Sequence, residues 1–166
     1  MNSIFERCSI RKYQNKAIEK ENIKLILKAA FCAPSARNAQ PWEFIVIEDK
    51  STLQTLSTFT PYAKPLQNAA LGVVVCANLN RNPMIDFCEQ DLAAATQNML
   101  LQAQTLGIGS VWIGVYPMEE RVAMLKEHFK LPEQIVPLWM IAFGYPDEKA
   151  NIKNKFQESY IHYEKW

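Results

Sequence analysis

The stretch Ala-Pro-Ser-Ala-Arg-Asn-Ala-Gln-Pro-Trp, residues 33–42, separates a helical pattern before it from an extended apolar pattern, residues 44–47, after it. Its two prolines fix their own backbone angles and bias the residue before each toward an extended conformation, which predicts a stiff loop. Asn38 and Gln40 carry side-chain amides that donate and accept hydrogen bonds. Such paired groups suit a planar heterocycle with its own carbonyl and N–H groups. Composition alone favours a plainer interpretation, a turn rich in turn-forming residues.

A cluster of basic residues lies upstream of this loop. The spacing Ser3-x-x-Glu6 is typical of a capping box, so we expect a short helix that starts at Ile4 and is followed by Arg7, Ser9 and Arg11. Two arginines four residues apart, with a hydroxyl between them, can converge on one phosphate through paired donors. Taken alone, such a cluster is more often a solvated basic face.

The two segments together resemble the FMN-dependent nitroreductase family. That family combines Arg-Arg-Ser-x-Arg with a later Ala-Pro-Ser-x-x-Asn-x-Gln-Pro-Trp, and this chain has Arg-Cys-Ser-Ile-Arg at residues 7–11, so Cys8 replaces the second arginine. The likeness continues through residues 106–114 (Leu-Gly-Ile-Gly-Ser-Val-Trp-Ile-Gly), 143–146 (Phe-Gly-Tyr-Pro) and 161–163 (Ile-His-Tyr). It therefore covers nearly the whole chain.

The resemblance implies a set of residues around an FMN molecule. The phosphate and ribityl chain would be held by the N-terminal cluster, the ring by the Asn38 loop, and the flavin N5 would meet a backbone N–H near Gly114 or Val115. Two lysines near the C-terminus resemble the tail's basic pair that contacts the phosphate. The expected FMN-binding residues are Arg7, Cys8, Ser9, Arg11, Pro34, Ser35, Asn38, Gln40, Trp112, Ile113, Gly114, Lys153 and Lys155.

The resemblance also implies the chemistry. Tightly bound, non-covalent FMN would take a hydride from NAD(P)H at N5 and pass electrons to a small organic acceptor, such as a nitroaromatic, quinone or enone, in a ping-pong scheme. No side chain is a compelling general acid, so we expect no catalytic residue. Alternatives are a flavin-binding sensor, a non-catalytic dimeric flavoprotein and a dehalogenase-type member of the same family.

Composition narrows the class of protein. A chain of 166 residues and 19.1 kDa is expected to form one domain, residues 1–166. A net charge of +1 predicts no nucleic-acid partner, and the longest apolar run, residues 69–77, is too short to span a membrane. The N-terminus lacks an export signal, so we expect a cytoplasmic protein. The four cysteines show no Cys-x-x-Cys pair and only two histidines accompany them, which predicts reduced thiols and no metal site.

Periodicity predicts strands that alternate with helices. Strands are expected at about 42–47, 71–77, 111–115 and 135–143, and helices at about 20–33, 51–56, 86–106 and 118–129. Caps are expected at Ser51 and Asp86. Helix 86–106 is apolar on several faces, so it is central or lies at an interface.

The pattern alone favours a three-layer α/β domain with a parallel sheet. The resemblance implies instead an α+β, three-layer nitroreductase-like fold, with a mixed, mostly antiparallel sheet between helices. In that fold the tail from about residue 147 packs on the partner subunit of a homodimer. The run Gly107-Ile108-Gly109 invites a dinucleotide-binding interpretation, which we reject because the order is helix then strand.

Overall fold

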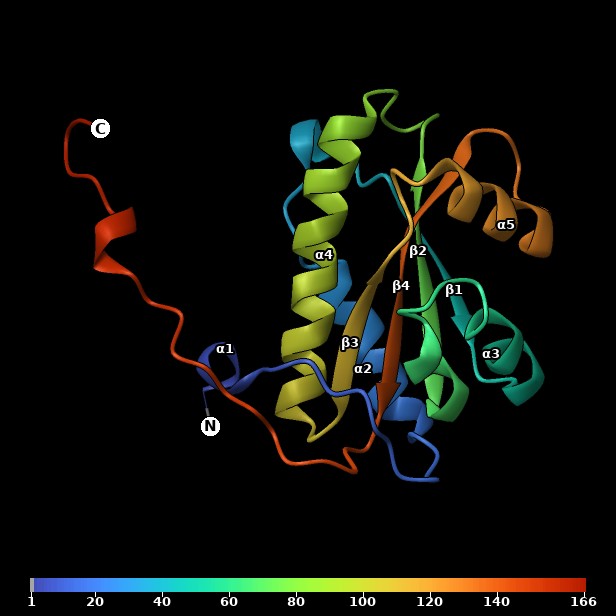
Figure 1. Cartoon of the computed structure of the whole chain (residues 1–166). Coiled ribbons are helices and arrows are strands. Elements are labelled where there is room, and N and C mark those ends of the chain that lie inside the picture. Colours follow the sequence, from blue (N-terminus) through green and yellow to red (C-terminus); the bar gives the residue numbers. More distant parts are fainter. Residues whose placement is uncertain (1) are drawn as a thin grey trace.

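Four antiparallel strands form the centre of the computed structural model, which describes residues 2–166 (Figure 1). They are β1 (Trp42–Ile47), β2 (Leu71–Asn78), β3 (Gly109–Gly114) and β4 (Ile135–Gly144), in the spatial order β1-β2-β4-β3. The parallel sheet that the alternating pattern favoured is therefore wrong, and the antiparallel sheet implied by the resemblance is confirmed. Among the described residues, parallel pairing occurs only as an isolated bridge between Ser9 and Ser110.

Helices cover both faces of this sheet and complete three layers. The helices α2 (Lys20–Ala30) and α4 (Ile85–Thr105) bury apolar side chains in a core on one face, around Leu92 and Met99. On the other face, α3 (Lys50–Leu56) and α5 (Glu119–Phe129) contribute Leu53, Leu56 and Leu125 to a second core. Because both faces are covered, β2 is buried along Leu71–Ala77, as its continuous valine-rich run predicts.

Three helices begin after residues other than the expected caps. The carboxylate of Asp49 accepts from the backbone N–H of Thr52 at 2.7 Å, so Asp49 rather than Ser51 caps α3. The helix α1 (Ser3–Glu6) begins after Asn2 and has no side-chain cap. Asp86 lies in the first turn of α4 instead of capping it, because Met84 holds that place.

The chain after residue 146 leaves the body of the molecule. Residues 147–166 are exposed, and Figure 1 shows them passing α1 and ending away from the sheet. They carry exposed apolar side chains, at Ile152, Phe156, Tyr160, Tyr163 and Trp166. Exchange of this tail between two subunits is not tested by a single chain and stays a prediction.

The remaining ordered pieces are 3₁₀ turns at Ala36–Asn38, Lys64–Asn68 and Glu158–Tyr160. Among residues 2–166, no helix combines the length and the apolar character needed to cross a membrane. The same residues contain no group of three or more His, Cys, Asp or Glu side chains that could hold a metal ion.

Candidate functional site

An open groove of about 790 Å³ lies between the N-terminal segment and the tail. Six of the residues expected to bind FMN line it: Arg7, Cys8, Ser9, Arg11, Lys153 and Lys155. Four of these side chains are cationic, and none forms a salt bridge with a carboxylate within the described chain. Four cationic side chains that form no ion pair of their own fit an anion such as a phosphate.

The N-terminal wall of the groove is tied to the sheet and to the start of the tail. The backbone N–H of Ile10 donates to the carbonyl of Ser110 at 2.9 Å, and the backbone N–H of Arg11 donates to Glu148 Oε1 at 2.5 Å. Gly109 permits this approach, since a Cβ there would meet the Ile10 side chain at 2.7 Å. The segment that carries the arginines is therefore fixed by backbone contacts, which leaves their guanidinium groups free for a ligand.

The buried side chain of Tyr13 also holds this N-terminal segment in place. Its hydroxyl donates to the carbonyl of Ile10 at 2.6 Å and lies 3.2 Å from that of Ala142. Burial, and then the nearby charge of Glu148, raise the pKa of Tyr13 above its usual value. The hydroxyl therefore remains a donor at all physiological pH values.

The loop that carries Asn38 and Gln40 has an unusual backbone. Arg37, Asn38 and Gln40 adopt left-handed φ angles of 55°, 53° and 48°, which non-glycine residues seldom do. Gln40 Nε2 donates to Asn38 Oδ1 at 3.0 Å, which orients the two exposed amides together. The side-chain NH₂ group of Asn38 and the side-chain oxygen Oε1 of Gln40 remain available to a ligand.

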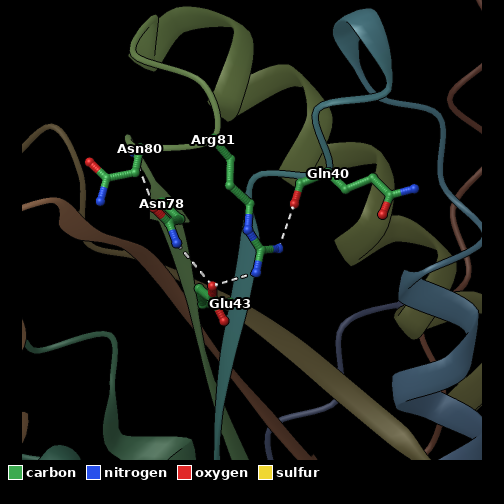
Figure 2. A network of polar contacts seen from close by, with 5 residues as sticks. All are labelled: Gln40, Glu43, Asn78, Asn80 and Arg81. Carbon is green, nitrogen blue, oxygen red and sulfur yellow. Dashed lines mark hydrogen bonds and ion pairs between the residues drawn. The ribbon is translucent and has the colours of Figure 1, made fainter.

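The loop is held by its neighbours rather than by its prolines alone. Ser35 Oγ accepts from the backbone N–H of Gln40 at 3.0 Å, so this hydroxyl closes the loop on itself. Figure 2 shows Arg81 donating to the carbonyl of Gln40, at 3.0 Å, and pairing with Glu43, at 3.1 Å. Pro34 is exposed beside this loop.

The third group of expected residues lies on β3, an edge strand. Ser110 turns its carbonyl outward to Ile10, while the N–H of Val115 donates inward to Leu138 at 3.2 Å. Because backbone groups alternate along a strand, the N–H of Gly114 points to the open edge. A Cβ at Gly114 would meet nothing within 4 Å, so a flat ligand can approach there. Gly114, not Val115, is thus the available donor.

The neighbours of Gly114 play different parts. The Ile113 side chain is buried in the core, so it can meet a ligand only through its backbone. Trp112 is half-buried and packs against Trp139, with ring centroids 4.5 Å apart. Arg121 Nη1 donates to the carbonyl of Gly114 at 3.1 Å and steadies the strand end.

The basic groove and the Asn38 loop lie at different ends of α4. Ser3, beside the groove, shares a hollow with Gln102 and Thr105 at the C-terminal end of α4. Ala36, in the loop, donates its backbone N–H to Asp91 Oδ1 at 2.9 Å, near the N-terminal end. At a rise of about 1.5 Å per residue, Asp91 and Gln102 are separated by about 16 Å along the helix axis, so the two groups contact separate parts of α4.

A sequence model of the nitroreductase family matches residues 4–74 and 60–145. The chain belongs to the nitroreductase family. A protein of Archaeoglobus fulgidus, provisionally named NADH dehydrogenase/NAD(P)H nitroreductase, is 45% identical over 98% of this chain and 96% of its own.

Solved structures of nitroreductases have the same fold as this chain. An FMN-dependent nitroreductase from Clostridium difficile has a TM-score of 0.92 and 33% identity, covering 99% of both chains. A provisionally assigned nitroreductase from Desulfovibrio desulfuricans, crystallised in complex with FMN, has a TM-score of 0.88 and 30% identity, covering 99% of this chain and 95% of that one.

Three residues that the sequence reasoning did not single out support the expected site residues: Arg81, Asp91 and Arg121. Asp91 offered a signal, because it is the one charged residue within residues 90–103 of the long helix α4. Arg81 and Arg121 offered none, since each acts on a backbone carbonyl that no sequence pattern connects to it.

Proposed function

We propose that this nitroreductase binds FMN tightly and without a covalent bond, and transfers electrons from NAD(P)H to a small organic acceptor. The observation that carries the proposal is the groove in which Arg7, Arg11, Lys153 and Lys155 converge without carboxylate partners. A phosphate dianion in such a groove is favoured by several charge-assisted contacts. The similar C. difficile nitroreductase is FMN-dependent and the similar D. desulfuricans protein was crystallised with FMN, which supports this choice of anion.

Different groups of the chain are proposed to bind different parts of FMN. The cations of the groove hold the phosphate, and the exposed amides of Asn38 and Gln40 meet the polar edge of the ring. The outward N–H of Gly114 is the donor proposed to face N5. Bound FMN supplies a ring that accepts a hydride from NAD(P)H and passes electrons to the acceptor. Nitroaromatics, quinones and enones are the proposed acceptors, in a ping-pong scheme.

No side chain receives a catalytic role in this proposal. The two histidines lie elsewhere: His128 packs edge-on against Phe59 and Phe129, and His162 stacks on Trp166 in the tail. We therefore assign the reactivity to the cofactor and the orientation to the protein.

We infer that the complete site is formed by a homodimer. Within one chain, the basic groove and the Asn38 loop contact separate parts of α4, and in the inferred dimer an FMN takes one of these groups from each chain. The exposed apolar side chains of the tail support this inference, because a second subunit would cover them.

Anaerobic titration of the purified protein tests the proposal. We expect a flavin band at about 450 nm that one equivalent of NADH or NADPH bleaches and that an added quinone restores. A bound flavin that neither nucleotide bleaches indicates a sensor. Protein that binds no flavin even in excess FMN indicates a scaffold, and either result contradicts the proposal.

A further inference from the structure

Asp91 is a buried charge beneath the Asn38 loop. Only 7% of the residue is exposed; its Oδ1 accepts from the backbone N–H of Ala36, and its Oδ2 is buried without a hydrogen-bond partner in the described chain. A buried carboxylate that is only half satisfied destabilises the chain that contains it. An apolar residue would suit this face of α4 better for stability alone, which points to a role in shaping the loop.

Arg81 contacts the other end of the same loop. Its guanidinium donates to the carbonyl of Gln40 at 3.0 Å and to Glu43 Oε1 at 3.1 Å (Figure 2). Asn78 Nδ2 also donates to Glu43 Oε1, at 3.0 Å. The guanidinium is thus oriented by residues of β1 and β2 before it reaches the loop.

Between these two contacts lie the three left-handed residues, Arg37, Asn38 and Gln40. Such a backbone persists only where surrounding contacts hold it. Asp91 accepts a hydrogen bond from the N–H of Ala36 at the beginning of the turn, and Arg81 donates one to the carbonyl of Gln40 at its end. The carboxylate therefore holds a backbone donor of the loop, and the guanidinium holds a backbone acceptor. The internal bonds of the loop, such as the one from Gln40 N–H to Ser35 Oγ, connect its residues only to one another, and just after the loop the carbonyl of Pro41 accepts from the N–H of Asn78 at 2.7 Å.

We propose that Asp91 and Arg81 are positioning residues that clamp residues 35–40 from both ends and so present the Asn38 and Gln40 amides to the flavin ring. The part of this proposal that concerns flavin rests on the proposed function. The clamp itself does not, because its contacts lie within the chain.

Trypsin cleavage after Arg37 measures the clamp without reference to flavin. We expect Asp91→Ala and Arg81→Ala to accelerate cleavage at Arg37 about tenfold or more in the full chain freed of FMN, because the loop opens locally. Cleavage at Lys28 and Lys126, which lie in helices, reports global unfolding and should not change. Asp86→Ala, on the exposed first turn of α4, and Lys24→Ala serve as matched controls. Unchanged cleavage at Arg37, or equal acceleration at all sites, overturns the clamp.

Affinities for FMN and riboflavin test the role of the clamp in ring binding. Asp91→Ala and Arg81→Ala should weaken both ligands by the same factor, about tenfold, because both ligands share the ring. Asp91→Asn keeps an acceptor for Ala36 and should bind within about threefold of the natural protein. If Arg81→Ala binds FMN more weakly but riboflavin as before, Arg81 contacts the phosphate. If both affinities are unchanged, the clamp does not affect binding of the ring. Either result overturns the proposal. If the unmodified chain binds no flavin, the proposed function fails, while the cleavage assay still decides the clamp.

Discussion

The indole Nε1 of Trp139 donates a hydrogen bond of 2.8 Å to the hydroxyl of Thr96, and this contact joins the middle of β4 to the middle of α4. Both side chains are buried, and Trp112 packs against the Trp139 ring. The contact therefore sets the position of the β3 edge, where Gly114 lies, relative to the long helix.

We expect Thr96→Val to lower the free energy of unfolding by about 1–3 kcal/mol, because the similar shape is kept while the indole N–H loses its acceptor. Urea denaturation measures the change. The matched control is Thr105→Val on the same helix, where an exposed hydroxyl donates to the carbonyl of Leu101. Equal stability of the two variants would show that the buried hydrogen bond contributes nothing.

Arg11→Ala should yield pale, largely flavin-free protein. Loss of one charge-assisted phosphate contact weakens FMN about ten- to a hundred-fold. Fluorescence titration measures the affinity, and excess FMN should restore much of the activity. Lys12→Ala, the neighbouring cation outside the groove, is the control. Riboflavin, which lacks the phosphate, should bind the variant as before; equal weakening of both ligands would mean that Arg11 does not read the phosphate.

Replacement of Asn38 by leucine should weaken FMN and riboflavin together, by about 1–3 kcal/mol, because polar groups of the ring lose their partner. Leucine also suits the left-handed φ of 53° poorly. Asn38→Gly separates the two effects, since glycine accepts this backbone but has no amide. If the glycine variant binds flavin normally, the amide is not a ligand and the loop is only a turn.

Acid should weaken α3 through Asp49. Hydrogen bonds from the Ser51 hydroxyl and then from Thr52 lower the pKa of Asp49 to about 2, below its unfolded value near 3.8. A depressed folded pKa contributes stability that is present above the unfolded pKa and lost as pH falls through the folded one. The melting temperature of Asp49→Ala should thus lie below that of the natural chain at pH 6, and the difference should shrink between pH 4 and pH 2. A difference that does not vary with pH would assign the effect of Asp49 to something other than its charge.

Light scattering at micromolar concentration should report about twice the chain mass of 19.1 kDa. Deletion of residues 147–166 should lower the dimer's stability and remove Lys153 and Lys155 from the groove. A stable monomer loaded with FMN would refute the shared site.

The elements were largely predictable from periodicity, and their pairing was not. The strand Trp42–Ile47 and the buried run within β2 follow from local patterns. The pairing of Val75 with Trp139 depends on residues far apart in the chain, and the local pattern favoured a parallel sheet. Only the family resemblance indicated the antiparallel one.

The structure places the expected site residues in three separate places, and the sequence motifs could not predict this arrangement. Sequence motifs identify side chains with suitable chemistry, such as Arg11 and Asn38. They carry no information about contacts with a backbone group distant in sequence, such as the contact from Asp91 to Ala36. The wrong cap at Ser51 has a local cause, since Asp49 and Ser51 compete for the same helix end and the carboxylate is the stronger acceptor.

The separation of the basic groove from the Asn38 loop along α4 has a genetic consequence. In the proposed dimer each site takes its phosphate ligands from one chain and its ring ligands from the other. A chain defective at Arg11 and a chain defective at Asn38 each form only sites with weakened FMN binding when alone, yet their mixed dimer contains one site with all of its ligands. Random pairing of equal amounts gives intact ligands to roughly a quarter of all sites. Two recessive lesions in one gene can thus complement each other within a single assembled molecule.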